Sequence, residues 1–284
     1  MPALAQRSGF RASASLFWPL LAELRGLKLD VGGLVSKAGL SLPELEDPDS
    51  RFAFEDLVLL GGLAASAAGD PAFGLHLAEH YRPNVFGVLD YLGRSSGTLG
   101  RALQSLCRYN RLLQDAAETL IEQRGDAVLI WQRPLGGFRL PSAMNENAMA
   151  NLVVIARDLA GHTDAPLEVT FVHPAPSYAE EHTRIFRAPV LFNAERDSIL
   201  MSADVLSLPV RTADRGLSEI LERHASQLLD SIPRVSLYSH RVRERVAERL
   251  RDGAPTAVAI ARELRTSQRT LRRRLQQEQT TYEL

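Results

Sequence analysis

The last thirty residues constrain the fold of this chain most strongly, because they place two short amphipathic helices in a fixed order. The first helix is expected over residues 257–264, and the residues available for burial in it are Val258, Ile260, Ala261 and Leu264. Residues 265–267 form the turn. The second helix is expected over residues 268–279, where Leu271 and Leu275 lie four residues apart on one face. This order of elements predicts a helix-turn-helix.

Positive charge is concentrated in this part of the chain. Residues 236–284 hold eleven arginines against six Asp and Glu, a net charge of +5, whereas the whole chain carries −1 and residues 1–235 therefore carry −6. Four of these arginines fall in the first two turns of the second helix: Arg269, Arg272, Arg273 and Arg274. Such a helix can reach phosphates and base edges in a DNA major groove. We therefore predict that it binds double-stranded DNA; a helical hairpin with a solvated, charged face is the alternative.

Two residues shape the predicted turn. Ser267 is expected to cap the second helix by accepting a hydrogen bond from the amide of Thr270 or Arg269. Arg265 occupies the first turn position, which often requires a positive φ and then favours Gly or Asn. We therefore expect either a strained backbone at Arg265 or a differently shaped turn.

These residues resemble a known family. Residues 252–275 are similar to the first helix-turn-helix of AraC-type transcription regulators, in which a serine, an Arg-Thr-Leu sequence and paired arginines precede a leucine. Upstream, five segments resemble the sensor domain of the AraC subgroup with an arabinose-binding-like N-terminal domain: 86–91, 98–103, 108–113, 171–176 and 185–192. That label does not make arabinose the ligand. The resemblance covers nearly the whole chain.

The resemblance implies a bacterial, cytoplasmic transcription regulator, here predicted to be an activator and not an enzyme. Its N-terminal domain would sense a small molecule or mediate dimerisation. The implied partners are double-stranded DNA, an unidentified small-molecule effector, a second copy of the chain and RNA polymerase. The DNA-binding residues implied by the recognition helix are Arg269, Arg272 and Arg273, with Gln268 and Arg274 beside them.

The family also predicts the division of the chain. AraC-type DNA-binding domains carry two helix-turn-helix units joined by a long helix, whereas this chain ends at Leu284, where that helix would begin. We therefore expect this chain to bind its operator weakly or not at all. The predicted parts are a sensor and dimerisation domain over 1–208, a linking helix and linker over 209–235, and a first helix-turn-helix over 236–284.

Composition excludes several other classes of protein. The 284 residues are 45% hydrophobic and 24% charged, which is typical of an ordinary soluble protein with room for two domains. Cys107 is the single cysteine, so an internal disulfide is excluded and a reducing cytoplasm is favoured. The apolar run over residues 16–22 is too short to span a membrane. We predict no membrane partner, no metal and no cofactor.

The pattern upstream of the basic segment predicts an α+β domain. Helical spacing recurs over residues 13–115 and again over 145–160 and 178–186. Short strands are expected at 118–123, 127–133, 167–172, 190–192 and 199–201, the first two forming a hairpin. The predicted fold class is therefore an α+β N-terminal domain, with helices around a small, mainly antiparallel sheet, followed by an all-α helix-turn-helix module.

Two further helices are expected before the basic segment. The helix over 214–230 has one apolar stripe, formed by Leu217, Ile220, Leu221, Leu228 and Leu229. Packing on the sensor explains this stripe as well as a dimer contact or a coupling element does. A supporting helix is expected over 239–250, with apolar residues at Val242, Val246 and Leu250 and its end at Asp252-Gly253.

A small-molecule sensor needs an apolar cavity in which a few polar groups converge. Six side chains between the predicted helices and sheet could supply these groups: Tyr91, Arg94, Tyr109, Trp131, Arg133 and Glu146. The sequence does not show which of them face a cavity.

One short pattern suggests an alternative function. His76, Glu79 and His80 have the spacing of the inverted zincin motif, in which two histidines bind zinc and the glutamate acts as a base. A third ligand would have to come from elsewhere, for example Glu146. A metal-dependent enzyme is therefore one alternative to the regulator. A sensor that acts through a protein partner, with the terminal helices as its docking face, is the other.

Overall fold

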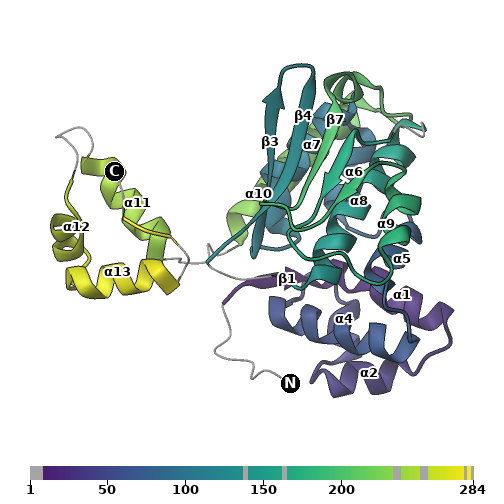
Figure 1. Cartoon of the computed structure of the whole chain (residues 1–284), viewed down its shortest axis with the longest axis horizontal. Helices are drawn as coiled ribbons and strands as arrows, with labels where there is room; N and C mark the ends of the chain where they lie inside the picture. Colours follow the sequence, from purple (N-terminus) through teal and green to yellow (C-terminus); the bar gives the residue numbers. More distant parts are fainter. Residues whose placement is uncertain are drawn as a thin grey trace. The chain divides into compact units, whose positions relative to one another are not determined.

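The computed structural model describes residues 9–136, 140–161, 165–232, 238–249, 255–277 and 280–282. These residues belong to two compact units, the first within 1–133 and 140–232 and the second within 134–139 and 233–284. Figure 1 shows the elements of both units. Several predicted features lie outside the described residues: the linker at Pro233, Leu250, and the helix end at Asp252-Gly253.

The first unit begins with a largely helical region. Its elements in chain order are β1 (Arg11–Ser13), η1 (Ala14–Leu16), α1 (Trp18–Gly26), α2 (Val31–Lys37), α3 (Leu42–Glu46), β2 (Arg51–Ala53), α4 (Phe54–Ala68), α5 (Phe73–Glu79), α6 (Val88–Ser95), α7 (Leu99–Tyr109) and η2 (Asn110–Leu112). The predicted helical spacing is confirmed, but β1 and β2 form an antiparallel pair that the pattern did not predict. Strands of three residues are too short to show an alternating pattern.

A five-stranded sheet follows. Its strands are β3 (Ala117–Arg124), β4 (Ala127–Pro134), β5 (Glu168–Thr170), β6 (Val190–Leu191) and β7 (Ser198–Ser202), in the spatial order β3-β4-β7-β5-β6. The predicted hairpin of β3 and β4 turns at Gly125, whose φ of +59° suits glycine. β7 pairs antiparallel with both β4 and β5, and β5 pairs parallel with β6. The sheet is therefore mixed, and the predicted α+β class holds for this unit.

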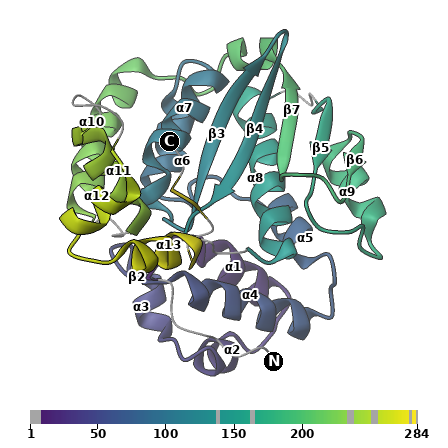
Figure 2. The same cartoon turned by 60° about the vertical axis from the view of Figure 1, so that its left-hand side comes forward.

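Helix α8 (Ser142–Ala160) packs along this sheet and buries its apolar face there (Figure 2). Met149, Ala150 and Val153 of α8 share one core with residues of β4, β5 and β7. On the other side α8 approaches α5 very closely: a Cβ added to Gly74 would lie 2.2 Å from the carbonyl oxygen of Ala143. Asn147 Nδ2 donates a hydrogen bond of 2.9 Å to the Gly74 carbonyl at the same place. The glycine is therefore required by the contact between the two helices.

The first unit is completed by α9 (Ala179–Phe186), η3 (Ala203–Ser207) and α10 (Arg215–Ser231). Helix α10 packs against α6 and η2, where Ala225, Leu221 and Leu228 join a cluster with Leu89 and Leu92. Packing on the sensor thus accounts for part of the predicted stripe. Leu217 and Ile220, however, are 44% and 56% exposed.

Among the described residues, no single helix is long and apolar enough to cross a membrane. Helices α4 and α5 reach the required length and hydropathy only as a pair, and the chain bends by 95° between them.

The described part of the second unit contains α11 (Tyr238–Arg249), α12 (Ala257–Glu263) and α13 (Gln268–Gln277). The three helices share one apolar core, which consists of Tyr238, Val242, Ile260, Ala261, Leu271 and Leu275 with Val246, Leu264 and Tyr282 packed against it. The predicted burial of Val258 was wrong, because this side chain is 42% exposed. The buried stripe of α12 runs through Ala257, Ile260 and Ala261, and position 258 falls beside it.

The turn between α12 and α13 adopts the strained conformation. Arg265 has a φ of +51°, in the left-handed region. Its amide donates to the Arg262 carbonyl at 3.0 Å, and the Thr266 amide donates to the Ala261 carbonyl at 2.9 Å. This pair of bonds is the Schellman arrangement that commonly ends a helix at a glycine. Ser267 Oγ accepts from the Thr270 amide at 3.1 Å, as predicted for the cap.

Replacing Gly74 by alanine is expected to destabilise the protein by about 1–3 kcal/mol, because the added methyl group must push α5 away from α8. The matched control is Gly61→Ala in α4, where nothing lies within 4 Å of an added Cβ. That change should stabilise the helix by about 0.5–1 kcal/mol. Chemical unfolding followed by circular dichroism measures both. Equal stability of the two variants would contradict the close contact.

Replacing Arg265 by glycine is expected to stabilise the α12–α13 turn by about 1 kcal/mol, since glycine adopts the left-handed conformation without steric cost. Amide hydrogen exchange on the whole chain should then show about fivefold greater protection in α12 and α13. Arg262→Gly, within α12, should lower protection instead. A loss of protection in Arg265→Gly would mean that the turn has another shape.

Candidate functional site

Helix α13 presents a face of arginines. Arg269, Arg272 and Arg273 are exposed, while Leu271 and Leu275 on the other side are buried in the core of the second unit. The spacing follows from the helical repeat, which carries the i, i+3 and i+4 positions to a common side. No described acidic side chain forms an ion pair with these three arginines within 4 Å. Their guanidinium groups are therefore available to an external anion.

The other two predicted DNA-binding residues are placed differently. Arg274 is exposed, but its guanidinium carbon lies 4.9 Å from the centroid of the Tyr238 ring in α11. This cation–π contact ties α13 to α11 and gives Arg274 a structural role as well. Gln268, the first residue of α13, is half-buried.

Two contacts hold α12 in position within the second unit. Arg249 of α11 forms an ion pair with Glu263 of α12, with Nη2 and Oε1 2.6 Å apart. The Tyr282 hydroxyl donates a hydrogen bond of 2.7 Å to the Pro255 carbonyl, just before α12. Burial raises the pKa of Tyr282, so this phenol stays protonated at neutral pH and remains a donor.

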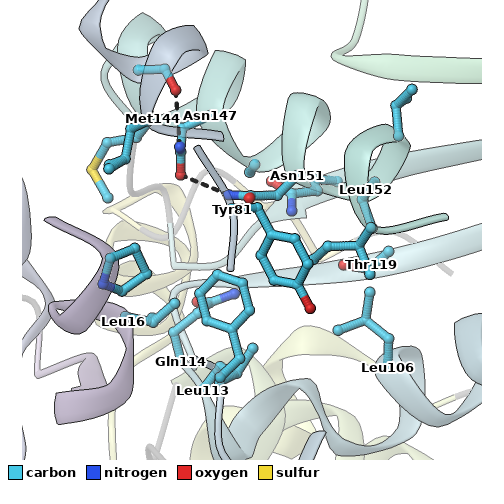
Figure 3. Close-up of a pocket in the computed structure, with 18 of the residues that line it drawn as sticks. Leu16, Tyr81, Leu106, Leu113, Gln114, Thr119, Met144, Asn147, Asn151 and Leu152 are labelled. Atoms are coloured by element: carbon cyan, nitrogen blue, oxygen red, sulfur yellow. Dashed lines mark hydrogen bonds between the residues drawn. The ribbon is translucent and has the colours of Figure 1, made fainter. Parts of the chain in front are cut away.

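The first unit contains a partly open cavity of about 510 Å³ between its helices and the sheet. Figure 3 shows the side chains around it, most of them apolar. Elements from the whole unit contribute, among them α4, α5, α6, α7 and α8 together with β4 and β7. The volume lies within the range of small-molecule sites, and an apolar lining with a few polar groups is typical of them.

One group of polar side chains in the cavity comes from α8. Asn147 and Asn151 lie one turn apart, and Asn151 Nδ2 donates to Asn147 Oδ1 at 3.0 Å. Asn147 in turn donates to the Gly74 carbonyl (Figure 3). On the opposite wall, Gln114 accepts hydrogen bonds from the amides of Ala116 and Ala117 at 2.6 and 2.9 Å. These groups are therefore held in fixed orientations at the cavity wall.

The second polar group is formed by Tyr81 and Asp90. The Tyr81 hydroxyl donates to Asp90 Oδ1 at 2.6 Å, and Arg94 Nη2 donates to the same hydroxyl at 3.2 Å. Burial and the bond to Asp90 raise the pKa of Tyr81, so the phenol stays protonated. The Asp90 side chain is 2% exposed, and its second oxygen, Oδ2, has no hydrogen-bond partner among the described residues. Asp90 is the single charged side chain among the described residues that line the cavity.

The six predicted effector-binding residues do not line this cavity. Tyr91 is 47% exposed, and Tyr109 is buried with its hydroxyl donating to the Glu222 carbonyl at 3.4 Å. Arg94 lies next to the cavity, where it pairs with Asp90 and Asp158. Tyr91 and Asp90 are neighbours on α6, and only Asp90 lies on the face of this helix that lines the cavity. The sequence alone did not show which face that is.

The remaining three predicted residues belong to the sheet and to α8. The Trp131 ring lies under Arg196, with 4.7 Å between the guanidinium carbon and the ring centroid. Arg133 is exposed and pairs with Glu118 of the neighbouring strand. Glu146 is fully buried, but it faces α9.

Sequence reasoning missed Tyr81, Asp90, Asn147 and Asn151. One feature of the sequence could have indicated them: Asn147 and Asn151 lie four residues apart, on a helix otherwise rich in small and apolar residues. A second was the carboxylate of Asp90 directly after Leu89, at the start of an amphipathic helix.

The inverted zincin pattern does not form a metal site. Helix α5 ends at Glu79, so His80 lies beyond the helix and bonds to Glu23 Oε2 at 2.9 Å. Both nitrogens of His76 are engaged, with Asp70 at 2.6 Å and Glu181 at 3.0 Å. Burial lowers the pKa of His76, but these two bonds outweigh it and raise the pKa above its ordinary value.

Glu79, the proposed base of that motif, is also engaged. It forms a two-pronged ion pair with Arg184, at 2.6 and 2.7 Å. The hydrogen bonds from Arg184 hold the pKa of Glu79 below its usual range. The three side chains of the motif thus have separate partners and do not converge on one point.

Comparison with known proteins agrees with this architecture. The family model for the arabinose-binding domain of AraC transcription regulators, N-terminal part, matches residues 29–210. The ornithine utilization regulator of Pseudomonas aeruginosa is 31% identical over 242 residues, which cover 84% of this chain and 70% of the relative. The solved structure of the transcriptional regulator CdpR from Pseudomonas aeruginosa has a similar fold, with a TM-score of 0.50 and 20% identity, and covers 94% of this chain and 80% of that one.

The family match spans most of the first unit, including α4 to α9 and the whole sheet. The match to the ornithine utilization regulator extends over more of the chain than that domain alone. This chain therefore belongs to the AraC family of transcription regulators, in the group that carries an arabinose-binding N-terminal domain.

Proposed function

We propose that α12 and α13 act as a helix-turn-helix, and that α13 enters the major groove of an operator. The observation that carries this proposal is the exposed set of Arg269, Arg272 and Arg273 on the side of α13 away from its buried leucines. Arginine can bind guanine through two hydrogen bonds and phosphate through its charge. Gln268 begins the same helix and can add a contact, whereas Arg274 mainly braces α13 against Tyr238.

The cavity of the first unit is the proposed effector site. Its lining supports a mostly apolar molecule with one hydrogen-bond donor or amine, because Asp90 Oδ2 is a buried acceptor that lacks a partner among the described residues. Pairing such an oxygen stabilises the complex, since an unsatisfied buried acceptor costs about 1–3 kcal/mol. Ornithine, named in the relative's function, carries two ammonium groups and a carboxylate. The described lining has one charged residue, so we infer a less polar effector for this chain.

The path from effector to DNA is proposed to run through α6 and α10. Asp90 and Leu89 of α6 line the cavity, and α6 packs on α10 through Leu89 and Leu92. Helix α10 ends at Ser231, shortly before the second unit begins in the sequence. If α6 can adopt two arrangements, an effector that binds more tightly to one of them shifts α6 toward that arrangement. Because α10 packs on α6, α10 would shift with it. Dimerisation, the activator role and contact with RNA polymerase stay predictions.

Replacing Arg272 or Arg273 by alanine is expected to weaken operator binding by about 1–3 kcal/mol each, because each removes a guanidinium that can bind a base edge. DNA selected from a random pool by the whole chain at low salt supplies the operator, and fluorescence anisotropy measures the affinity. Selection should also show relaxed base preference at one position per variant.

The matched control is Arg262→Ala, which removes the same charge from an exposed position on α12. It should weaken binding slightly and equally for all sequences, as expected for loss of a phosphate contact. If Arg262→Ala weakened binding as much as Arg272→Ala and Arg273→Ala, α13 would not be the reading helix.

A neutral apolar amine, N-phenyl-1-naphthylamine, is expected to bind the cavity with a rise in fluorescence. Gly61→Leu should weaken this binding by about tenfold, because Gly61 lines the cavity and its added side chain projects into open space. Gly26→Leu adds the same side chain at an exposed position away from the cavity and should leave binding unchanged. Equal binding by both variants would place the dye elsewhere and would count against the effector site.

A further inference from the structure

Outside the cavity, three side chains that commonly bind metal ions converge in the first unit. They are Glu146 of α8, His173 after β5 and His182 of α9, and their ligand atoms all lie within 4.8 Å of one another. Nε2 of His182 is 3.1 Å and Nε2 of His173 is 3.3 Å from the same oxygen, Glu146 Oε1. Figure 2 shows α9 at the edge of the sheet formed by β5 and β6. The cluster therefore joins three elements that are distant in sequence.

The surrounding structure holds the cluster in place. Asp197 accepts a hydrogen bond from the Val172 amide at 2.8 Å, beside His173, and another from Asn145 Nδ2 at 2.8 Å, beside Glu146. One buried carboxylate thus fixes both the loop that carries His173 and the helix that carries Glu146. Glu146 and His182 are fully buried; the His173 side chain is 13% exposed, but its Nε2 is buried with them.

The hydrogen bond between His173 and the backbone determines which nitrogen of the neutral ring carries the proton, and therefore which one is left as an acceptor near Glu146. Nδ1 lies 2.9 Å from the Pro174 carbonyl, which can only accept, so Nδ1 carries the proton. In neutral His173 the other nitrogen, Nε2, then carries a lone pair, and it lies 3.3 Å from Glu146 Oε1 without a hydrogen bond between them. Two acceptors at this distance repel unless a positive charge lies between them. A backbone carbonyl that orients a histidine in this way is also the usual support of a metal ligand.

The two distances from the histidine nitrogens to Glu146 Oε1, 3.1 and 3.3 Å, suit a small divalent cation. With metal–ligand bonds of about 2.0–2.2 Å in tetrahedral geometry, ligand atoms are about 3.4 Å apart. The Tyr178 hydroxyl lies 3.1 Å from Glu146 Oε2 and 3.3 Å from Oε1, so it can donate to Oε2 while Oε1 binds the cation. Burial and the charge of Glu146 raise the pKa of Tyr178 to about 12, so this hydroxyl remains a donor. The ring of Phe192 lies 5.0 Å from that of His182 and 5.6 Å from that of His173, and limits the access of water.

We propose that Glu146, His173 and His182 bind one zinc-like divalent cation. Two imidazole nitrogens and one carboxylate oxygen are a ligand set that zinc accepts. The bound ion would link α8, the loop after β5 and α9, and so stabilise the sheet edge of the first unit. This site is separate from the effector cavity and from α13, and it does not depend on the proposed DNA binding.

The whole chain, without a histidine tag and dialysed against zinc and then against metal-free buffer, tests the proposal by mass-spectrometric metal analysis. About one zinc per chain is expected in the wild type. Glu146→Gln and His182→Gln keep the side-chain size and should lose the stoichiometric zinc. His173→Gln, in a loop and partly exposed, disturbs folding least and should weaken zinc binding by at least about tenfold. His76→Gln removes a histidine from the same unit but outside the cluster, and should keep the zinc.

A second measurement separates loss of the ion from loss of the fold. Zinc should raise the melting temperature of the wild type and of His76→Gln, and should leave that of His173→Gln unchanged. Cobalt(II) in the wild type should give the strong visible absorption of a tetrahedral site. The proposal is overturned if the wild type retains no stoichiometric zinc, or if His173→Gln binds zinc as tightly as the wild type. The cluster would then be a hydrogen-bonded group without a metal.

Discussion

The approach of α5 to α8 at Gly74 is the contact on which the architecture of the first unit depends. Without a side chain at this position, the backbone of α8 comes within reach of α5, and Asn147 bonds directly to the Gly74 carbonyl. This contact sets the position of α8, which packs on the sheet and also lines the cavity. Two consecutive residues of α8 then serve different places: Glu146 faces α9, and Asn147 faces the cavity. One helix thus contributes both to the wall of the cavity and to a buried cluster of charged and polar groups.

Burying polar groups in this way is costly, and the carboxylates near α8 and α9 are compensated locally. A buried carboxylate needs hydrogen bonds or an opposite charge, because water no longer solvates it. Tyr178 and His182 supply bonds to Glu146, and Val172 and Asn145 supply them to Asp197. Asp90 departs from this pattern, as does Asp115: Tyr81 donates to one oxygen of Asp90, and the other is buried without a hydrogen-bond partner among the described residues. Asp90 differs from Asp115 in that it belongs to the lining of the cavity, which is why the proposed effector is a hydrogen-bond donor.

The sequence predicted the class of fold, the family and the arginine face of α13, because these depend on periodicity and local spacing. Leu271 and Leu275 recur at helical spacing, and the arginines between them must point elsewhere. The cavity could not be predicted in the same way. Its walls are apolar residues that any core would contain, and the side of a helix that enters it depends on tertiary packing. Tyr91 and Asp90 illustrate this: they are neighbours in sequence, yet one is exposed and the other lines the cavity.

The unpartnered oxygen of Asp90 has a consequence for the amount of this regulator in a cell. An effector that donates a hydrogen bond to this oxygen would make the occupied sensor unit more stable than the same unit without it. A larger share of the chains without effector would then be unfolded at any moment and exposed to proteases. The effector would in this way control how long each molecule of the regulator survives, in addition to what that molecule does on DNA.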